Sequence, residues 1–123
     1  MKTKQIFSTA GRIKSFSYAF NGLKILLREE HNSWIHIAAA ICAVVAGFIL
    51  KISFVEWIAI IICIVLVFAL ELINSAIENI ADVVSPQKNE MIKKAKDLSA
   101  AAVLFAATGA AVIGLIIFIP KII

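Results

Sequence analysis

Polar and apolar residues occur along this chain in long blocks. After a polar, basic opening, three apolar segments predict membrane-spanning helices at about residues 33–50, 54–84 and 98–119. The second segment contains no Gly or Pro and would be about 45 Å long, which exceeds a hydrocarbon core of about 30 Å. Its last third must therefore emerge from the core. Pro86 and Pro120 are expected to end the second and third helices, and Gln87 to Lys96 is expected to be a polar connector or a short helix.

Residues 11–30 have a helical period and predict an amphipathic helix lying on the membrane surface. Four apolar side chains fall within about 60° of one another on this helix, namely Phe16, Phe20, Leu23 and Leu27. The opposite side carries polar and basic residues, namely Lys14, Ser17, Asn21, Lys24 and Arg28. The alternative is a helix that packs on its own bundle, and the two interpretations are compatible.

The composition supports an integral membrane protein with one domain, residues 1–123. The chain is 62% hydrophobic with a mean hydropathy of +0.98, and a soluble domain this small could not hide so much apolar surface. Three helices also cannot bury several carboxylates among themselves, so self-association is expected. The net charge of +4 does not indicate a nucleic-acid partner, because the basic residues adjoin hydrophobic segments.

The basic residues also predict an orientation. Six Lys or Arg residues precede the first span and four lie in segment 85–97, whereas the turn at 51–56 and the C-terminal tail hold one each. Basic loops stay on the cytoplasmic side of a membrane. The N-terminus and segment 85–97 are therefore expected in the cytoplasm, in a multi-pass protein of the plasma (inner) membrane.

An acidic stripe interrupts the second span. On a helix, its polar side chains share a sector about 100° wide, and they are Glu71, Asn74, Ser75, Glu78 and Asp82. Glu71 directly follows a long apolar run, and carboxylates at membrane depth are costly and usually functional. Oxygen ligands beside water suggest Mg²⁺ and the nucleotide phosphates that it carries.

Other candidates are expected at the same membrane face. Glu29 and Glu30 end the surface helix, and Lys96 and Asp97 begin the third span. Glu30 could share a cation with the stripe, Lys96 could bind phosphate, and a carboxylate without metal could act as a general base. The alternative is a set of helix-end charges in solvated headgroups.

Other polar or reactive residues carry weaker signals. Cys42 and Cys63 lie in apolar runs and are expected to be small buried residues. His31 and His36 flank the start of the first span, where interface packing is expected. The sequence contains no Walker A loop, no Gly-rich kinase loop and no Glu-x-x-His pair.

The polar segments resemble the signature of the prokaryotic diacylglycerol kinase family, which includes the undecaprenol kinases. The similarity rests on the spacing Glu-x-x-Asn-x-Ala-x-Glu-x-x-x-Asp in segment 71–82, on Lys96-Asp97, and on the small residues 100–104. Segment 12–22 resembles the surface helix of the family, and the similarity extends over about residues 12–123. Two stretches, 55–57 and 113–121, look more like undecaprenol kinases than diacylglycerol kinases.

The resemblance implies a homotrimer with active sites between protomers at the cytoplasmic interface. By motif position, Glu71 resembles the general base of the family, and Glu30 and Glu78 resemble the carboxylates that hold Mg²⁺ on ATP. The position of Glu30 is assigned from its distance to the first span. The remaining matches are to positions that contact or organise the nucleotide, and they are Asn74, Asp82, Lys96 and Asp97.

The expected function is therefore phosphoryl transfer from MgATP to the hydroxyl of a membrane lipid alcohol, either diacylglycerol or undecaprenol. Such a reaction would feed phospholipid synthesis or the recycling of cell-envelope lipid. The alternative is a non-enzymatic helical bundle that uses the stripe for association or cation passage. The residues alone leave the choice of lipid open.

Overall fold

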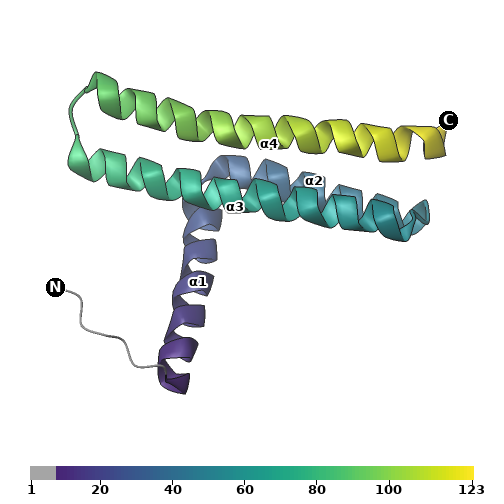
Figure 1. Ribbon diagram of the computed structural model, residues 1–123, viewed down its shortest axis with the longest axis horizontal. Helices are drawn as coiled ribbons and strands as arrows, with labels where there is room; N and C mark the ends of the chain where they lie inside the picture. Colours follow the sequence, from purple (N-terminus) through teal and green to yellow (C-terminus); the bar gives the residue numbers. More distant parts are fainter. Residues whose placement is uncertain (1–7) are drawn as a thin grey trace.

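The computed structural model describes residues 8–123, which form four α-helices and no strand. In chain order these are α1 (Thr9–Glu29), α2 (His31–Ile49), α3 (Phe54–Val84) and α4 (Glu90–Ile122). Figure 1 shows α2, α3 and α4 side by side, whereas α1 leaves the bundle at a steep angle. This confirms the expected all-α fold with one helix ahead of three spans.

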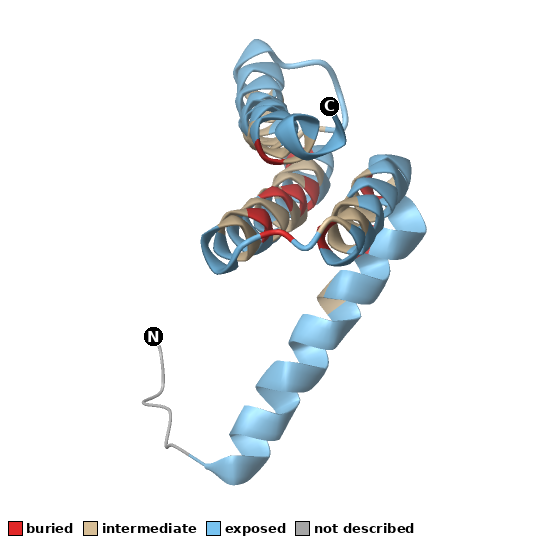
Figure 2. Ribbon diagram, turned by 90° about the vertical axis from the view of Figure 1, so that its right-hand side faces the viewer, coloured by how far each residue is buried: buried red, intermediate tan, exposed pale blue. Residues whose placement is uncertain are grey.

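Helix α3 is the centre of the bundle. It packs along α4 and also contacts α2 and α1. Seen from the end of the bundle, α2 and α4 lie on different sides of α3 (Figure 2). The buried apolar cluster is small and joins Ile52, Ile60 and Ile117. Most other large apolar side chains are exposed on the single chain, as expected for helices that face lipid or other protomers.

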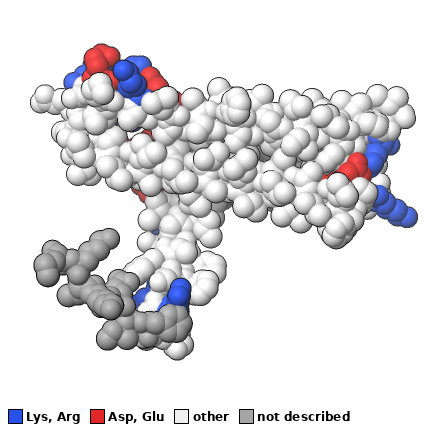
Figure 3. All heavy atoms as spheres, viewed as in Figure 1, with Lys and Arg blue, Asp and Glu red and all other residues white. Residues whose placement is uncertain are grey.

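The distribution of charge fits a membrane-spanning bundle. Helices α2, α3 and α4 are each long and apolar enough to cross a bilayer. On the face shown in Figure 3, charged side chains gather at the two ends of the bundle and along α1, and the middle of the bundle carries none. Uncharged surface between two charged ends is what a hydrocarbon core requires.

Helix α1 contacts the rest of the chain mainly through its last turns. Leu26 is its one buried residue, with 2% of its surface exposed. By contrast, Phe16 and Phe20, on the apolar face predicted from the sequence, are 67% and 68% exposed. An apolar face left uncovered by its own bundle supports a helix that lies on the membrane surface.

A tight corner at Glu30 joins α1 to α2. The Ser33 hydroxyl, fully buried, donates a hydrogen bond of 2.6 Å to the Glu30 carbonyl oxygen. The Trp34 indole N–H donates to the Leu27 carbonyl oxygen at 2.9 Å. These bonds hold the corner together: the end of α1 would otherwise leave the Leu27 carbonyl without a partner, and the Glu30 carbonyl also accepts from the Ser33 backbone N–H at 3.1 Å. They also fix the backbone position from which the Glu30 side chain extends.

The turn between α2 and α3 brings two helices very close together. Lys51 adopts a left-handed conformation (φ 51°), and the Ile52 N–H donates to the Gly47 carbonyl oxygen at 3.1 Å, as in a Schellman motif. Gly47 is buried, and a β-carbon there would lie 2.7 Å from the Trp57 ring. The Phe48 ring packs against the Trp57 ring at a tilt of 53°, with centroids 4.8 Å apart, which limits movement of the Trp57 ring.

Side-chain contacts join the start of α3 to the end of α4. Ser53 and Glu56 form a reciprocal capping box at the start of α3. The Glu56 carboxylate also forms an ion pair with the Lys121 ammonium group, near the end of α4, at 3.1 Å. Both charges are partly screened by surrounding side chains. The pair therefore aligns the two longest helices at the end of the bundle opposite the acidic stripe.

Helix α4 is longer than its apolar run predicted. Asn89 caps it by accepting from the backbone N–H groups of Met91 and Ile92, so most of the expected connector forms its first turns. The expectation that Pro120 ends this helix was wrong, because α4 continues to Ile122. Pro120 lacks the N–H that would bond the carbonyl group four residues earlier, but the backbone stays helical past it, and the Ile123 N–H donates to the Ile119 carbonyl oxygen at 3.2 Å.

The Gly47 contact predicts a stability change. Gly47→Ala should lower the unfolding free energy by about 1–3 kcal/mol, because a rigid ring would have to move. Thermal unfolding in detergent micelles would measure it. Gly109→Ala is the matched control, since a β-carbon there meets nothing within 4 Å. Equal melting temperatures for the two variants would contradict the close packing of α2 on Trp57.

Candidate active site

The acidic stripe lies on the last third of α3 and passes from buried to exposed. Glu71 and Ser75 are 4% and 6% exposed, Glu78 is half-buried, and Asp82 is exposed. Because α3 runs without Gly or Pro, its helical period keeps these side chains on one side. The stripe thus connects the apolar middle of the bundle with its charged end.

The α1–α2 corner brings Glu30 to this stripe. The Ser75 hydroxyl donates to a Glu30 carboxylate oxygen at 3.3 Å, across 45 positions of sequence. The negative charge of Glu30 acts on Glu78, one helical turn further along α3. Glu29 is exposed. Of the two adjacent acidic residues, Glu30 is the one that meets the stripe.

Helix α4 supplies a second wall. The Ser99 hydroxyl donates to the Asn74 amide oxygen at 2.6 Å, and Lys96 pairs with Asp82 at 3.1 Å. Lys96 also acts electrostatically on Glu78. A cation and two hydroxyls therefore lie along the stripe. Between exposed partners such as Lys96 and Asp82, the ion pair contributes little stability and can open at small cost.

Asp97 is the sequence-predicted residue that the single chain does not bring to the stripe. Its carboxylate pairs with Lys93, one turn earlier on α4, at 2.7 Å. The Asp97 side chain is 65% exposed. Successive residues on a helix point about 100° apart, so Lys96 can face α3 while Asp97 faces outward.

His36 is a residue that the sequence interpretation missed. Its Nε2 lies 3.0 Å from a Glu71 carboxylate oxygen, although interface packing was expected. The available signal was a histidine inside an otherwise apolar span, soon after Glu30.

In the described part of the chain, no buried side-chain nitrogen or oxygen lacks a hydrogen-bond partner.

The donor chemistry fits a hard cation. Within residues 8–123 no group of three or more His, Cys, Asp or Glu side chains is arranged to hold a metal ion by itself. Mg²⁺ does not need such a cage, because it is usually bound by one or two carboxylates with waters and phosphates. Glu30, at the α1–α2 corner, and Glu78, on α3, offer two carboxylates of like charge, and a shared cation would relieve their repulsion.

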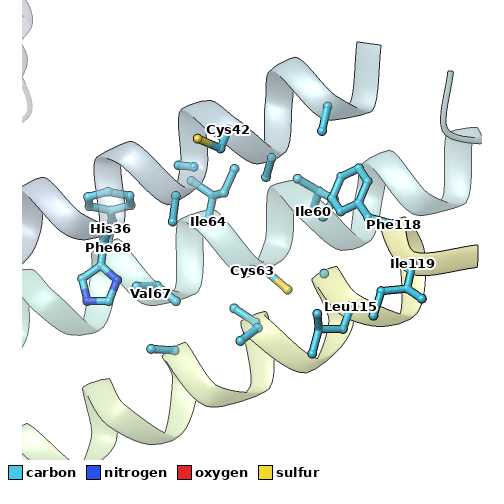
Figure 4. A pocket seen from close by; sticks show the side chains of 18 of the residues that line it. His36, Cys42, Ile60, Cys63, Ile64, Val67, Phe68, Leu115, Phe118 and Ile119 are labelled. Carbon is cyan, nitrogen blue, oxygen red and sulfur yellow. The ribbon is translucent and has the colours of Figure 1, made fainter. Parts of the chain in front are cut away.

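An apolar cavity adjoins the stripe. It has a volume of about 570 Å³ and lies between α2, α3 and α4. Figure 4 shows His36 and Phe68 at one end of it and Phe118 and Ile119 towards the other. Both cysteines line the cavity as free thiols. The expectation of burial was wrong for both on the single chain, because Cys42 is exposed and Cys63 is only partly buried.

Comparisons with known proteins agree with the resemblance seen in the sequence. The family model described as prokaryotic diacylglycerol kinase matches residues 17–118. Undecaprenol kinase of Bacillus subtilis is 39% identical over 109 residues, which cover 89% of this chain and 89% of that protein. Diacylglycerol kinase of Escherichia coli K12 is 32% identical over 94 residues, covering 76% and 77%. Diacylglycerol kinase of Synechocystis sp. is 31% identical over 109 residues, covering 88% and 62%.

The family match covers most of α1, all of α2, all of α3 with the acidic stripe, and all but the last turn of α4. They give no support to a non-enzymatic bundle. The chain belongs to the prokaryotic diacylglycerol kinase family, a family of membrane lipid kinases.

Proposed function

We propose that this protein transfers the γ-phosphoryl group of ATP to the hydroxyl of a membrane lipid alcohol, with Glu71 as the general base. The observation that carries the proposal is the position of Glu71. Its carboxylate is buried where the apolar middle of the bundle meets the polar stripe, beside an apolar cavity. A lipid hydroxyl and a nucleotide phosphate can meet at such a boundary.

The chemistry needs a base, alignment and charge neutralisation. Glu71 takes the proton of the lipid hydroxyl as its oxygen bonds to the γ-phosphorus. The bond from that phosphorus to the β–γ bridging oxygen breaks, and ADP leaves. Burial excludes bulk water from this carboxylate, which favours transfer to the lipid over hydrolysis of ATP.

We propose that Glu30 and Glu78 hold Mg²⁺ on the nucleotide. When bound, the cation would neutralise negative charge on the phosphates. Lys96 adds a positive charge near the same carboxylates. Asn74 and Asp82 lie beside them, where they would contact the bound nucleotide. Ser75 and Ser99 position Glu30 and Asn74 through their hydroxyls.

Two lipid alcohols are candidates. Undecaprenol is the first, because the Bacillus subtilis undecaprenol kinase matches this chain over 89% of both proteins. Diacylglycerol is the second, because several relatives of similar identity are named diacylglycerol kinases. In either case the hydrocarbon tail would stay in the bilayer while the hydroxyl reaches Glu71.

We also propose a homotrimer in the plasma membrane, with the stripe at the cytoplasmic face. The excess of Lys and Arg in the N-terminal segment and the α3–α4 region supports this orientation. Asp97 supports shared sites, because it faces away from the stripe of its own chain. In a closed ring, an outward residue of one protomer can meet the site of the next.

The base assignment predicts that Glu71→Gln lowers turnover by about 10²–10⁴-fold while MgATP still binds. Purified protein in mixed micelles would be assayed with γ-labelled ATP and with undecaprenol or diacylglycerol. Glu29→Gln is the matched control, because it removes an exposed carboxylate near the same end of the bundle. Wild-type turnover by Glu71→Gln would remove the residue from the base role. No labelled product from either lipid with the wild-type protein would refute the proposed activity.

The shared cation predicts a non-additive pair. Glu30→Ala and Glu78→Ala should each raise the Mg²⁺ concentration needed for half-maximal activity, and the double variant should be no worse than the more severe single. Titrating Mg²⁺ at fixed ATP measures this, with Glu29→Ala as control. Independent, multiplying effects would mean that the two carboxylates do not serve one ion.

The outward position of Asp97 predicts complementation between inactive chains. Glu71→Gln and Asp97→Ala protein would be purified, unfolded together at equal amounts and refolded into micelles. If each site takes Glu71 from one chain and Asp97 from its neighbour, about a quarter of the sites in randomly mixed rings would regain both residues. Crosslinking would confirm mixed oligomers. Mixed oligomers without activity would show that both residues of a site come from one chain.

A further inference from the structure

The side chain that contacts the Glu71 carboxylate lies on another helix. His36, on α2, places Nε2 3.0 Å from Glu71 Oε1, a distance at which an imidazole N–H can donate to a carboxylate oxygen. The Glu71 side chain is 5% exposed and the His36 side chain 22%. The contact therefore joins α2 to α3 at the deepest carboxylate of the stripe.

The imidazole ring is itself held in place. The Phe68 ring meets it edge to face, with centroids 6.5 Å apart and an interplanar angle of 79°. Phe68 lies on α3, one turn before Glu71, so the same helix that carries the carboxylate also orients the ring. Such a contact restricts rotation of the ring without competing for its nitrogen atoms.

We propose that His36 is a positioning residue for the lipid kinase reaction and that it fixes the Glu71 carboxylate for proton abstraction. This inference rests on the proposed function and concerns the same site. By occupying Oε1, His36 leaves Oε2 to accept the proton of the lipid hydroxyl. A Glu side chain has three rotatable bonds, and a fixed carboxylate avoids losing that freedom during each turnover.

A different role for His36 would be as part of the wall of the apolar cavity, where it would contact the hydrocarbon tail of the lipid (Figure 4). The two roles predict different kinetics. A wall residue changes the apparent KM for the lipid. A positioning residue changes kcat, because its interaction is needed once the hydroxyl is bound.

The experiment compares His36→Leu, which removes the donor, with His36→Gln, which keeps an N–H of similar reach. His31→Gln is the control, because His31 is an exposed histidine at the start of the same helix. Each variant is assayed for kcat, for KM with ATP and for KM with the lipid. Melting temperatures in micelles identify variants that fail to fold, and His36→Gln keeps the test valid if His36→Leu does.

The expected result is a fall in kcat of about 10- to 100-fold for His36→Leu, with both KM values nearly unchanged and most of kcat recovered in His36→Gln. In a Glu71→Gln background, His36→Leu should cause no further loss, because the group that it positions is already gone.

Four results would overturn the inference. These are an unchanged kcat in His36→Leu, a change confined to the lipid KM, a folded His36→Gln as slow as His36→Leu, and losses that multiply with Glu71→Gln. If the wild-type protein is active and the His36 variants match it, the inference fails and the lipid kinase function stands. If the wild-type protein phosphorylates no lipid alcohol, the function fails and the inference with it.

Discussion

The cost of keeping a carboxylate out of water governs this structure. Glu71 is 4% exposed at the end of an apolar run, where an ionised group without partners would be unstable. The fold meets this cost with an imidazole from α2 and a stripe of polar side chains that leads towards the charged end of α3. The apolar middle of the bundle and its reactive centre are therefore parts of one arrangement, since the same helix α3 provides both.

The supporting residues act through the backbone as much as through side chains. Ser33 and Trp34 satisfy the carbonyl groups at the end of α1, and this fixes the corner from which Glu30 reaches α3. Ser75 and Ser99 then hold Glu30 and Asn74. None of these four residues is assigned as the base or as a metal ligand. Their contribution is to limit how far the oxygen atoms of the stripe can move, which matters in a reaction that depends on alignment.

The helices were predictable from sequence because each apolar run is long enough to exclude other structures. The start of α4 was less predictable, because residues 90–97 are mostly polar and Asn89 caps the helix that they begin. Within the site, the stripe followed from helical periodicity alone. The His36–Glu71 contact did not, because it depends on how α2 is rotated against α3, and no pattern within one helix contains that rotation. The outward direction of Asp97 has the same origin, since it depends on which face of α4 packs against α3.

The ion pair between Glu56 and Lys121 marks one boundary of the apolar belt, and distances along α3 can be counted from it. At 1.5 Å per residue, Glu71 lies about 22 Å from Glu56, inside a hydrocarbon core of about 30 Å. Asp82 lies about 39 Å from it, beyond the core. Position along α3 therefore gives depth in the membrane. The proposed base, Glu71, lies inside the hydrocarbon core, several ångströms from the core surface on the Asp82 side. In a bilayer of different thickness, lipid hydroxyl groups would lie at a different depth relative to Glu71. The match between the bilayer thickness and the length of α3 therefore becomes part of the enzyme's substrate selection.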